Sequence, residues 1–346
     1  MMHELVYFYP TGHENHNDPG HPERPERVEA IRRALQVAGL WQLYPQLHPI
    51  DVGEELLATV HSPAYLATLE HACRRANYLD ADTFTTRASW DLALHAAGGA
   101  TVVAATVWQH LARRGFALTR PPGHHAMRER GMGFCLLNNI SVAAEYLVQQ
   151  EGAERLAIVD LDLHHGNGTQ DIFYQRGDVF YISTHQSPFY PGTGDLKEMG
   201  AGPGMLTTAN FPLLPFSGDR AFMTIMDTLI LPLLDRFDPQ MILVSYGFDT
   251  HWSDPLGNLR LSAPVYGQLI EKLVQWADRH CQGRIALFLE GGYNLDAAQS
   301  CSIAVISALL GQPCPPLPGK VGGPSPDPEG TAWENVVQRA RELWGL

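Results

Sequence analysis

The sequence is short of basic residues and of cysteines, and each shortage excludes a class of protein. Its 24 Lys and Arg residues are outnumbered by 37 Asp and Glu residues, which gives a formal net charge of −13. Because a phosphate-binding surface needs clustered cations, we expect no nucleic-acid partner. The 5 cysteines are odd in number and form no Cys-x-x-Cys pair. We therefore expect neither a disulfide framework nor a cysteine-rich zinc site.

Long apolar runs are also missing. No stretch of about 18 uncharged apolar residues occurs, so we expect no membrane span. The segment Met1–Pro10 lacks the basic start and apolar run of an export signal, and we expect a cytoplasmic protein whose cysteines stay reduced. A composition of 45% hydrophobic and 18% charged residues is typical of a globular protein.

Segments with β-strand and helix patterns alternate along the chain. Strands are predicted at Phe116–Thr119, Leu156–Val159, Val179–Ser183, Met241–Ser245 and Ile285–Leu289. Helices are predicted at Pro25–Gly39, Ser89–Arg113, Asn139–Gln150, Arg220–Phe237 and Pro264–His280. The alternation predicts one α/β domain, residues 1–311, with a mostly parallel sheet covered by helices on both faces. Residues 312–346 are predicted to form a Pro/Gly-rich strap and a C-terminal helix that pack on the same domain.

Polar residues follow four of the predicted strands, at the edge of the sheet where α/β proteins bind their ligands. In the segment after Leu156–Val159, the alternate residues Asp160, Asp162 and His164 can share one face while the leucines between them point the other way. Asp249 follows another strand and completes a set of two carboxylates and one imidazole. Capping and solvated loop residues explain any one of these residues, but not all of them together at strand ends.

Three protein ligands leave a coordination position for water and substrate, as in a catalytic zinc site. Such mixed ligands also accept Fe(II) or Co(II), and we favour zinc. The segment His165–Thr169 contains two glycines, and we expect it to form a tight turn beneath the metal.

Two further features suggest hydrolytic chemistry. His124 and His125 follow a Pro-Pro-Gly turn, and either one can serve as a base near neutral pH. Tyr293 follows two glycines and can donate a hydrogen bond to a developing oxyanion. Each feature alone is more often a polar turn or a packed loop aromatic.

Taken together, these segments resemble the histone deacetylase family, which includes acetylpolyamine amidohydrolases and bacterial histone-deacetylase-like amidohydrolases. The resemblance covers nearly the whole chain. The motifs that carry it are His21–Arg27, Pro121–Ala126, Gly131–Asn139, Asp160–Thr169, Tyr190–Gly194, Gly247–Thr250 and Glu290–Asn294.

The resemblance implies a zinc-dependent deacetylase that hydrolyses the amide of an acylated lysine or another acylated amine. The implied zinc ligands are Asp162, His164 and Asp249. His125 is the implied general base, which later protonates the departing amine. Tyr293, where weakly active class II members have His, is implied to stabilise the oxyanion together with zinc.

The resemblance also assigns partners to the two histidines. His124 is oriented by Asp160 and acts electrostatically, and His125 pairs with Asn167, where some members have Asp. A neutral Asn stabilises an imidazolium less than a carboxylate does. We therefore expect His125 to remain a free base at neutral pH.

Further residues are implied to bind substrate. Phe134 and Tyr190 match the aromatic pair that walls the acyl-lysine tunnel, and Gly133 lies where a backbone contact to substrate is expected. Without the family match, ordinary core packing is the better explanation of both aromatics. Asp82 is the expected rim acid that holds the substrate backbone, with Asp80 as the alternative.

Potassium is implied as a structural ion. One potassium site falls on Asp160, Asp162, His164, Ser183 and Thr184. A second falls among the backbone carbonyls of Phe173, Arg176, Val179 and Phe211.

Three alternative functions compete with an acyl-lysine deacetylase. An acetylpolyamine deacetylase is disfavoured by Leu256, where polyamine-selective relatives have a Glu that pairs with a secondary ammonium. A ureohydrolase of the arginase type needs a second bridging acid for two manganese ions, which the sequence His164-His165-Gly166 lacks. A silent reader of acetyl-lysine could lose Tyr293 or His125, yet both are present.

Overall fold

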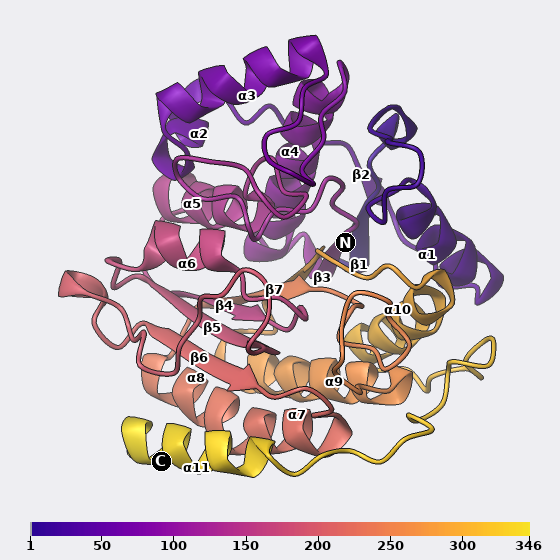
Figure 1. Ribbon diagram of the computed structural model, residues 1–346, viewed down its shortest axis with the longest axis vertical. Coiled ribbons are helices and arrows are strands. Elements are labelled where there is room, and N and C mark those ends of the chain that lie inside the picture. Colours follow the sequence, from indigo (N-terminus) through magenta and orange to yellow (C-terminus); the bar gives the residue numbers. More distant parts are fainter. Residues whose placement is uncertain (1) are drawn as a thin grey trace.

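Eight parallel strands form one central sheet. The computed structural model describes residues 2–346, and its strands lie in the order β2-β1-β3-β8-β7-β4-β5-β6 (Figure 1). Their bounds are β1 His3–Phe8, β2 Gln46–Leu47, β3 Ala112–Ala117, β4 Leu156–Asp160, β5 Val179–Gln186, β6 Thr208–Leu213, β7 Met241–Tyr246 and β8 Ile285–Leu289. The predicted α/β class is confirmed, and within the described residues the sheet is parallel throughout rather than mostly parallel.

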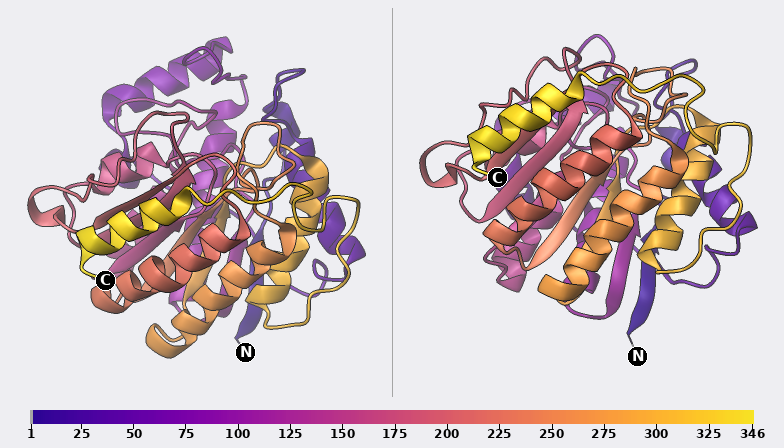
Figure 2. Two further views of the ribbon diagram at one scale, coloured as in Figure 1. Left: turned by 60° about the horizontal axis from the view of Figure 1, so that its bottom comes forward. Right: turned by 90° about the horizontal axis from the view of Figure 1, so that it is seen from below.

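Helices cover both faces of the sheet (Figures 1 and 2). One face carries α1 Glu26–Val37, α7 Asp219–Ile225, η3 Met226–Ile230, α8 Leu231–Phe237, α9 Ala263–His280, α10 Leu295–Leu309 and α11 Trp333–Trp344. The other face carries α4 Ser89–Trp108 and α5 Asn139–Glu151, with α2 Glu54–Val60, α3 Pro63–Arg75 and α6 Asn167–Phe173 beside them. The short turns η1 His13–Asn15 and η2 Gly202–Gly204 lie in connections. None of these helices is long and apolar enough to cross a bilayer.

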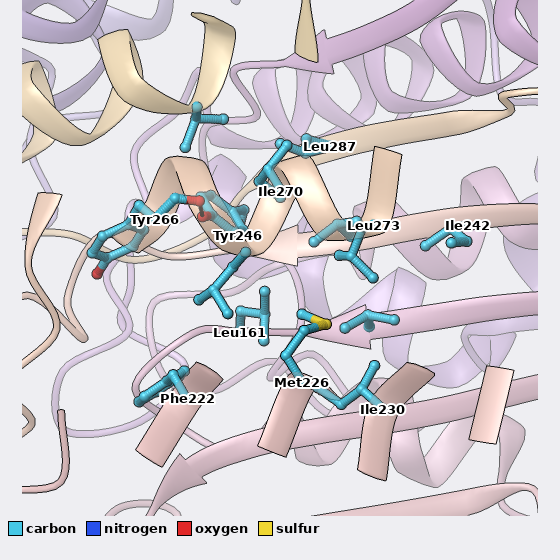
Figure 3. Packing of buried hydrophobic residues seen from close by; sticks show 14 of the residues in the cluster. Leu161, Phe222, Met226, Ile230, Ile242, Tyr246, Tyr266, Ile270, Leu273 and Leu287 are labelled. Atoms are coloured by element: carbon cyan, nitrogen blue, oxygen red, sulfur yellow. Dashed lines mark hydrogen bonds between the residues drawn. The ribbon is translucent and has the colours of Figure 1, made fainter. Parts of the chain in front are cut away.

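The larger core layer lies between the sheet and α7–α9. Figure 3 shows its interdigitated side chains, which include Leu161, Phe222, Met226, Ile230, Ile242, Tyr246, Tyr266, Ile270, Leu273 and Leu287. Burying a side chain of this size contributes about 1.5–3 kcal/mol. This layer therefore supplies a rigid base for the loops that leave the sheet.

The four central strands end level with one another. The register pairs Ala117 of β3 with Phe288 of β8, Phe288 with Ser245 of β7, and Ser245 with Asp160 of β4. Because ligands of α/β sheets bind beyond the carboxyl ends of the strands, the loops after these four strands are placed to build one site.

Several predicted elements need correction. The helix predicted at Ser89–Arg113 ends at Trp108, and β3 begins at Ala112, four residues before the predicted start. The two arginines of β3 gave this segment a polar pattern that did not predict a strand. Arg114 is nevertheless buried, and its guanidinium lies 2.5 Å from Asp278. Three strands, β1, β2 and β6, were not predicted. β2 is only two residues long, and β6 is an edge strand that contains a proline, which weakens the strand pattern.

The C-terminal segment packs against the same core. Trp333, Val337 and Trp344 of α11 belong to the buried cluster beneath the sheet. The strap that precedes α11 is anchored by Glu329, whose carboxylate accepts hydrogen bonds from two backbone N–H groups in the first turn of α7.

Candidate active site

Side chains from the loops after β3, β8, β7 and β4 meet beyond the carboxyl end of the sheet. In that order, the loops supply His124 and His125, Tyr293, Asp249, and the run Asp160–His164. The four strands are neighbours in the sheet, although they are far apart in the sequence. Topology therefore gathers the residues that the sequence placed at separate strand ends.

Asp162, His164 and Asp249 are close enough to hold one metal ion. Their ligand atoms lie within 4.8 Å of one another, in the one such group found among residues 2–346. His164 Nδ1 is 3.3 Å from Asp162 Oδ1 and 3.3 Å from Asp249 Oδ2. Asp249 Oδ2 is buried and has no hydrogen-bond partner within those residues. A buried carboxylate oxygen without a donor is costly unless a cation binds it, so the residues fit a divalent metal.

The backbone fixes the two carboxylates. Leu163 N donates to Asp249 Oδ1 at 3.0 Å, and Gly291 N donates to Asp162 Oδ2 at 2.8 Å. A Cβ atom on Gly247 would overlap Asp162 Oδ2, and a Cβ on Gly291 would overlap Asp249 Oδ2. These two glycines are therefore needed for the close approach of the backbone to the metal ligands.

The electrostatics of the site favour a positive charge. Burial lowers the pKa of His164, but its short contacts with the carboxylates of Asp162 and Asp249 and their negative charges outweigh burial and raise the pKa to about 9. The same two carboxylates would stabilise a divalent cation at that position.

His124 is arranged to carry a positive charge. Its Nδ1 lies 3.0 Å from Asp160 Oδ2, which also accepts a hydrogen bond from the Tyr181 hydroxyl at 3.0 Å. Burial lowers the pKa of His124, but the charges of Asp160, Asp162 and Glu290 raise it to about 10. A protonated His124 can attract a developing negative charge and is a poor base.

His125 is arranged to stay neutral. Its Nδ1 donates to Asn167 Oδ1 at 2.8 Å, which leaves Nε2 as the basic nitrogen. Its ring centre lies 5.7 Å from that of His164. Burial lowers the pKa of His125, and the charges of His124 and His164 lower it further, to well below its usual value. The two adjacent histidines are thus suited to different roles.

Glu290, the residue after β8, holds the turn that carries both histidines. Its Oε2 accepts hydrogen bonds from Gly123 N at 2.7 Å and from His124 N at 3.1 Å, and its Oε1 accepts one from Ser245 Oγ at 3.0 Å. The side chain is fully buried. It ties the turn after β3 to the ends of β7 and β8.

Tyr293 lies on the buried loop whose Gly291 N donates to Asp162. The Arg27 guanidinium is 4.8 Å from its ring centre, and the Phe134 ring packs edge-on against it at 5.8 Å. Burial raises the pKa of Tyr293 well above its usual value, against the opposing charge of Arg27. The hydroxyl therefore keeps the proton that it would donate.

The aromatic residues predicted to form a tunnel lie beside these groups. Phe134 contacts Tyr293, and the Tyr190 ring is 5.3 Å from that of His125 and 6.1 Å from that of His164. Tyr190 remains 38% exposed, so it lies at the entrance. Gly133 has φ +56°, and a Cβ there would lie 2.5 Å from the His125 ring, so a side chain at this position would disturb the base.

The two candidate rim acids lie on one loop, and both are exposed. Asp80 Oδ1 accepts hydrogen bonds from Asp82 N at 3.2 Å and from Thr83 N at 2.7 Å, so its carboxylate caps its own loop. The backbone carbonyl of Asp82 is held by His21 at 3.0 Å. The choice of Asp82 as the rim acid stays a prediction.

The expected tight turn is present at the start of the segment His165–Thr169. Asn167 N donates to His165 O at 2.8 Å and closes a three-residue turn around Gly166, which has φ −75° and ψ 65°. Helix α6 begins at Asn167. Gly166 is also needed for space, since a Cβ there would overlap Asp160 Oδ2. His165 Nδ1 lies 2.7 Å from Thr193 Oγ1. His165 is therefore engaged away from the metal ligands and does not replace the second bridging acid that a ureohydrolase requires.

The two potassium sites stay predictions. Ser183 Oγ is 2.9 Å from His185 Nδ1, and Thr184 Oγ1 is buried without a hydrogen-bond partner in the described chain. Around the second site, the carbonyl of Phe173 accepts a hydrogen bond from Arg176 N at 2.9 Å.

Three residues of the site were given no role from the sequence. Glu290 stood inside a recognised motif, and a carboxylate directly after the wholly apolar strand Ile285–Leu289 was a usable signal for it. Asp254 lies outside the recognised motifs, two residues before Leu256. Phe189 stacks on His164 with ring centres 5.5 Å apart. Its position beside Tyr190 was the only hint.

Comparisons with known proteins find consistent relatives. The profile of the histone deacetylase domain matches residues 21–309. A probable deacetylase of Archaeoglobus fulgidus is 39% identical over 309 residues, which cover 88% of this chain and 86% of that protein. Histone deacetylase 10, chloroplastic, of Oryza sativa is 40% identical over 316 residues (86% and 71%). The histone deacetylase-like amidohydrolase of Pseudomonas aeruginosa is 36% identical over 294 residues (84% and 77%).

The fold is shared with a solved structure. The crystal structure of the HDA15 HD domain superposes with a TM-score of 0.89 at 32% identity, over 99% of this chain and 94% of that one. The likeness therefore includes the sheet, both helical layers and the loops that build the site.

Proposed function

Because the chain belongs to the histone deacetylase family, we propose that it is a zinc-dependent hydrolase that removes the acyl group from acyl-lysine side chains. Membership of this family supports the activity of a deacetylase or amidohydrolase. The observation that carries the finer proposal is the convergence of Asp162, His164 and Asp249, within 4.8 Å, beside the two histidines and Tyr293.

We propose Asp162, His164 and Asp249 as the residues that hold zinc. The metal, when bound, supplies Lewis-acid polarisation of the scissile carbonyl and of the attacking water. The protein's own contribution is to fix the two carboxylates by backbone N–H groups and to keep one side of the site open toward His125 and Tyr293.

His125 is proposed as the group that moves protons. Its Nδ1–H is held by Asn167 Oδ1 at 2.8 Å, so its Nε2 is free to take a proton from the attacking water and to return one to the departing amine. His124, held cationic by Asp160, stabilises negative charge without exchanging its proton.

Tyr293 is proposed to donate a hydrogen bond to the tetrahedral oxyanion. Its high pKa keeps the hydroxyl protonated. Phe134 and Tyr190 would flank the methylene chain of the substrate and exclude water from the reacting carbonyl.

An acyl-lysine substrate is favoured over an acetylated polyamine by the chemistry of Leu256 and Asp82. Leu256 is half-buried on the loop that follows Asp249. An aliphatic side chain there offers no charge to the secondary ammonium of a polyamine, and the exposed Asp82 carboxylate can accept hydrogen bonds from a peptide backbone.

We also propose that potassium binds beside the zinc site. The buried and unpartnered Thr184 Oγ1 within the described chain fits an oxygen-ligated cation there.

The test is a side-by-side assay on zinc-loaded protein. Acetyl-lysine peptides, longer acyl-lysine peptides and acetylated polyamines are compared for release of the free amine, before and after chelation. The proposal predicts chelator-sensitive turnover that is fastest on acyl-lysine. Faster turnover of polyamines would overturn the substrate class, and tight binding without turnover would identify a reader instead of an enzyme.

A further inference from the structure

We propose that Asp254 is a positioning residue that holds the Tyr293 hydroxyl in its working orientation. Asp254 makes no hydrogen bond with Asp162, His164 or Asp249 within the described residues, and it would act through the backbone of the tyrosine loop. The inference rests on the proposed function, because it assigns a part in the same hydrolysis.

One carboxylate spans two loops. Asp254 Oδ2 accepts hydrogen bonds from Tyr293 N at 2.7 Å and from Asn294 N at 3.0 Å, and its Oδ1 accepts one from Leu256 N at 3.0 Å. The residue is 5% exposed. The two hydrogen bonds that Oδ2 accepts fasten the loop after β8 to the loop after β7.

A second tether strengthens the same junction. Asn294 Nδ2 donates to Ser253 O at 2.9 Å and to Ser253 Oγ at 3.1 Å, while Asn294 Oδ1 accepts from the first N–H groups of α10. The start of α10 and the Ser253–Asp254 turn therefore form one rigid block.

The peptide before Tyr293 is held on its other side as well. Gly292 has φ +113°, a conformation that only glycine adopts readily, and its carbonyl accepts a hydrogen bond from Arg27 Nε at 2.7 Å. The bond from Tyr293 N to Asp254 fixes the residue that follows this glycine. Misplacement of a reacting group by about 1 Å can cost about 100-fold in rate.

The experiment measures kcat and KM on an acetyl-lysine peptide for zinc-loaded wild type, Asp254→Ala, Asp254→Asn, Tyr293→Phe and the double variant Asp254→Ala/Tyr293→Phe. Asp227→Ala, which removes an exposed acid paired with Lys272 at 2.7 Å, is the control. We expect Asp254→Ala to lower kcat by about 10- to 100-fold. Asp254→Asn should lose less, because its amide oxygen can still accept from Tyr293 N and Asn294 N.

The double variant distinguishes positioning from a general loss of structure. If Asp254 acts through the hydroxyl, Asp254→Ala costs at most about 3-fold in the Tyr293→Phe background. If it costs the same factor in both backgrounds, the inference is overturned. A kcat of Asp254→Ala equal to that of wild type overturns it as well.

A measurement without substrate keeps this inference separate from the proposed function. Amide hydrogen exchange over residues 291–297 should be at least about 10-fold faster in Asp254→Ala, with β8 protected as in wild type. Unchanged exchange overturns the inference even if wild type hydrolyses no acylated amine, whereas inactivity of wild type together with faster exchange sinks the proposed function and leaves the anchoring of the loop supported.

Discussion

Replacement of Asn167 by Asp should move the pH dependence of catalysis. In the wild type, Asn167 Oδ1 accepts the Nδ1–H of His125 at 2.8 Å and is neutral. Burial and the charges of His124 and His164 hold the pKa of His125 well below its usual value. The enzyme should therefore keep its free base down to acidic pH, and kcat/KM should fall only when the pH drops through that low pKa.

The size of the expected shift follows from the geometry. Two unit charges about 4 Å apart interact by about 4 kcal/mol at an effective dielectric constant of about 20. That energy corresponds to about 3 pKa units. Burial opposes ionisation of the new carboxylate, and its contact with the adjoining cavity of about 370 Å³ screens its charge. Both effects reduce the expected shift in the pKa of His125. We expect the pKa of His125, and with it the acidic limb of the profile, to rise by about 1–3 pH units.

The assay is a kcat/KM profile from acidic to alkaline pH on zinc-loaded protein. Asn335→Asp makes the same chemical change on the exposed face of α11 and is the matched control. At pH values below the raised pKa of His125, kcat/KM of Asn167→Asp should fall steeply relative to wild type. At higher pH the difference between the two proteins should become smaller. An acidic limb that stays within about 0.3 pH unit of wild type would contradict the assignment of His125 as the base.

Three further predictions follow from the site. Tyr293→Phe should lower kcat by about 100-fold or more with a smaller change in KM, and a loss below about 10-fold in steady-state assays would remove the oxyanion role. Leu256→Glu should raise the preference for acetylated polyamine over acetyl-lysine peptide by about 10-fold or more; an unchanged ratio of kcat/KM values would show that this position does not select substrate. Glu290→Leu leaves the backbone N–H groups of Gly123 and His124 without an acceptor, at a cost of about 1–3 kcal/mol each. Denaturant unfolding should therefore show a clear loss of stability that Glu290→Gln largely avoids. Equal stability of Glu290→Leu and wild type would refute this role of Glu290.

The sequence predicted that the candidate residues would lie together because they stand just beyond strand ends. Asp162 lies two residues after β4 and Asp249 three residues after β7, and parallel strands bring their carboxyl ends to one edge of the sheet. The order of the strands was not predictable. That β7 and β8 lie between β3 and β4, and so bring Asp249 and Tyr293 beside His125, depends on long-range pairing.

The supporting contacts were the part that the sequence could not provide. Glu290 and Asp254 both accept hydrogen bonds from backbone N–H groups that are far away in the chain. Nearly every residue has a backbone N–H, so the sequence does not indicate which one a carboxylate will bind. The same limit applies to Gly166, whose turn was expected but whose need for space against Asp160 was not. At β3 the buried Arg114 made a strand resemble the end of a helix.

The central claim is that two carboxylates and one imidazole bind a catalytic zinc ion, and anomalous diffraction at the zinc edge from crystals of the zinc-loaded protein tests it most directly. The account predicts one strong peak about 2.0–2.2 Å from His164 Nδ1 and from a carboxylate oxygen of both Asp162 and Asp249. A peak elsewhere, or none at this position in zinc-saturated crystals, would contradict it.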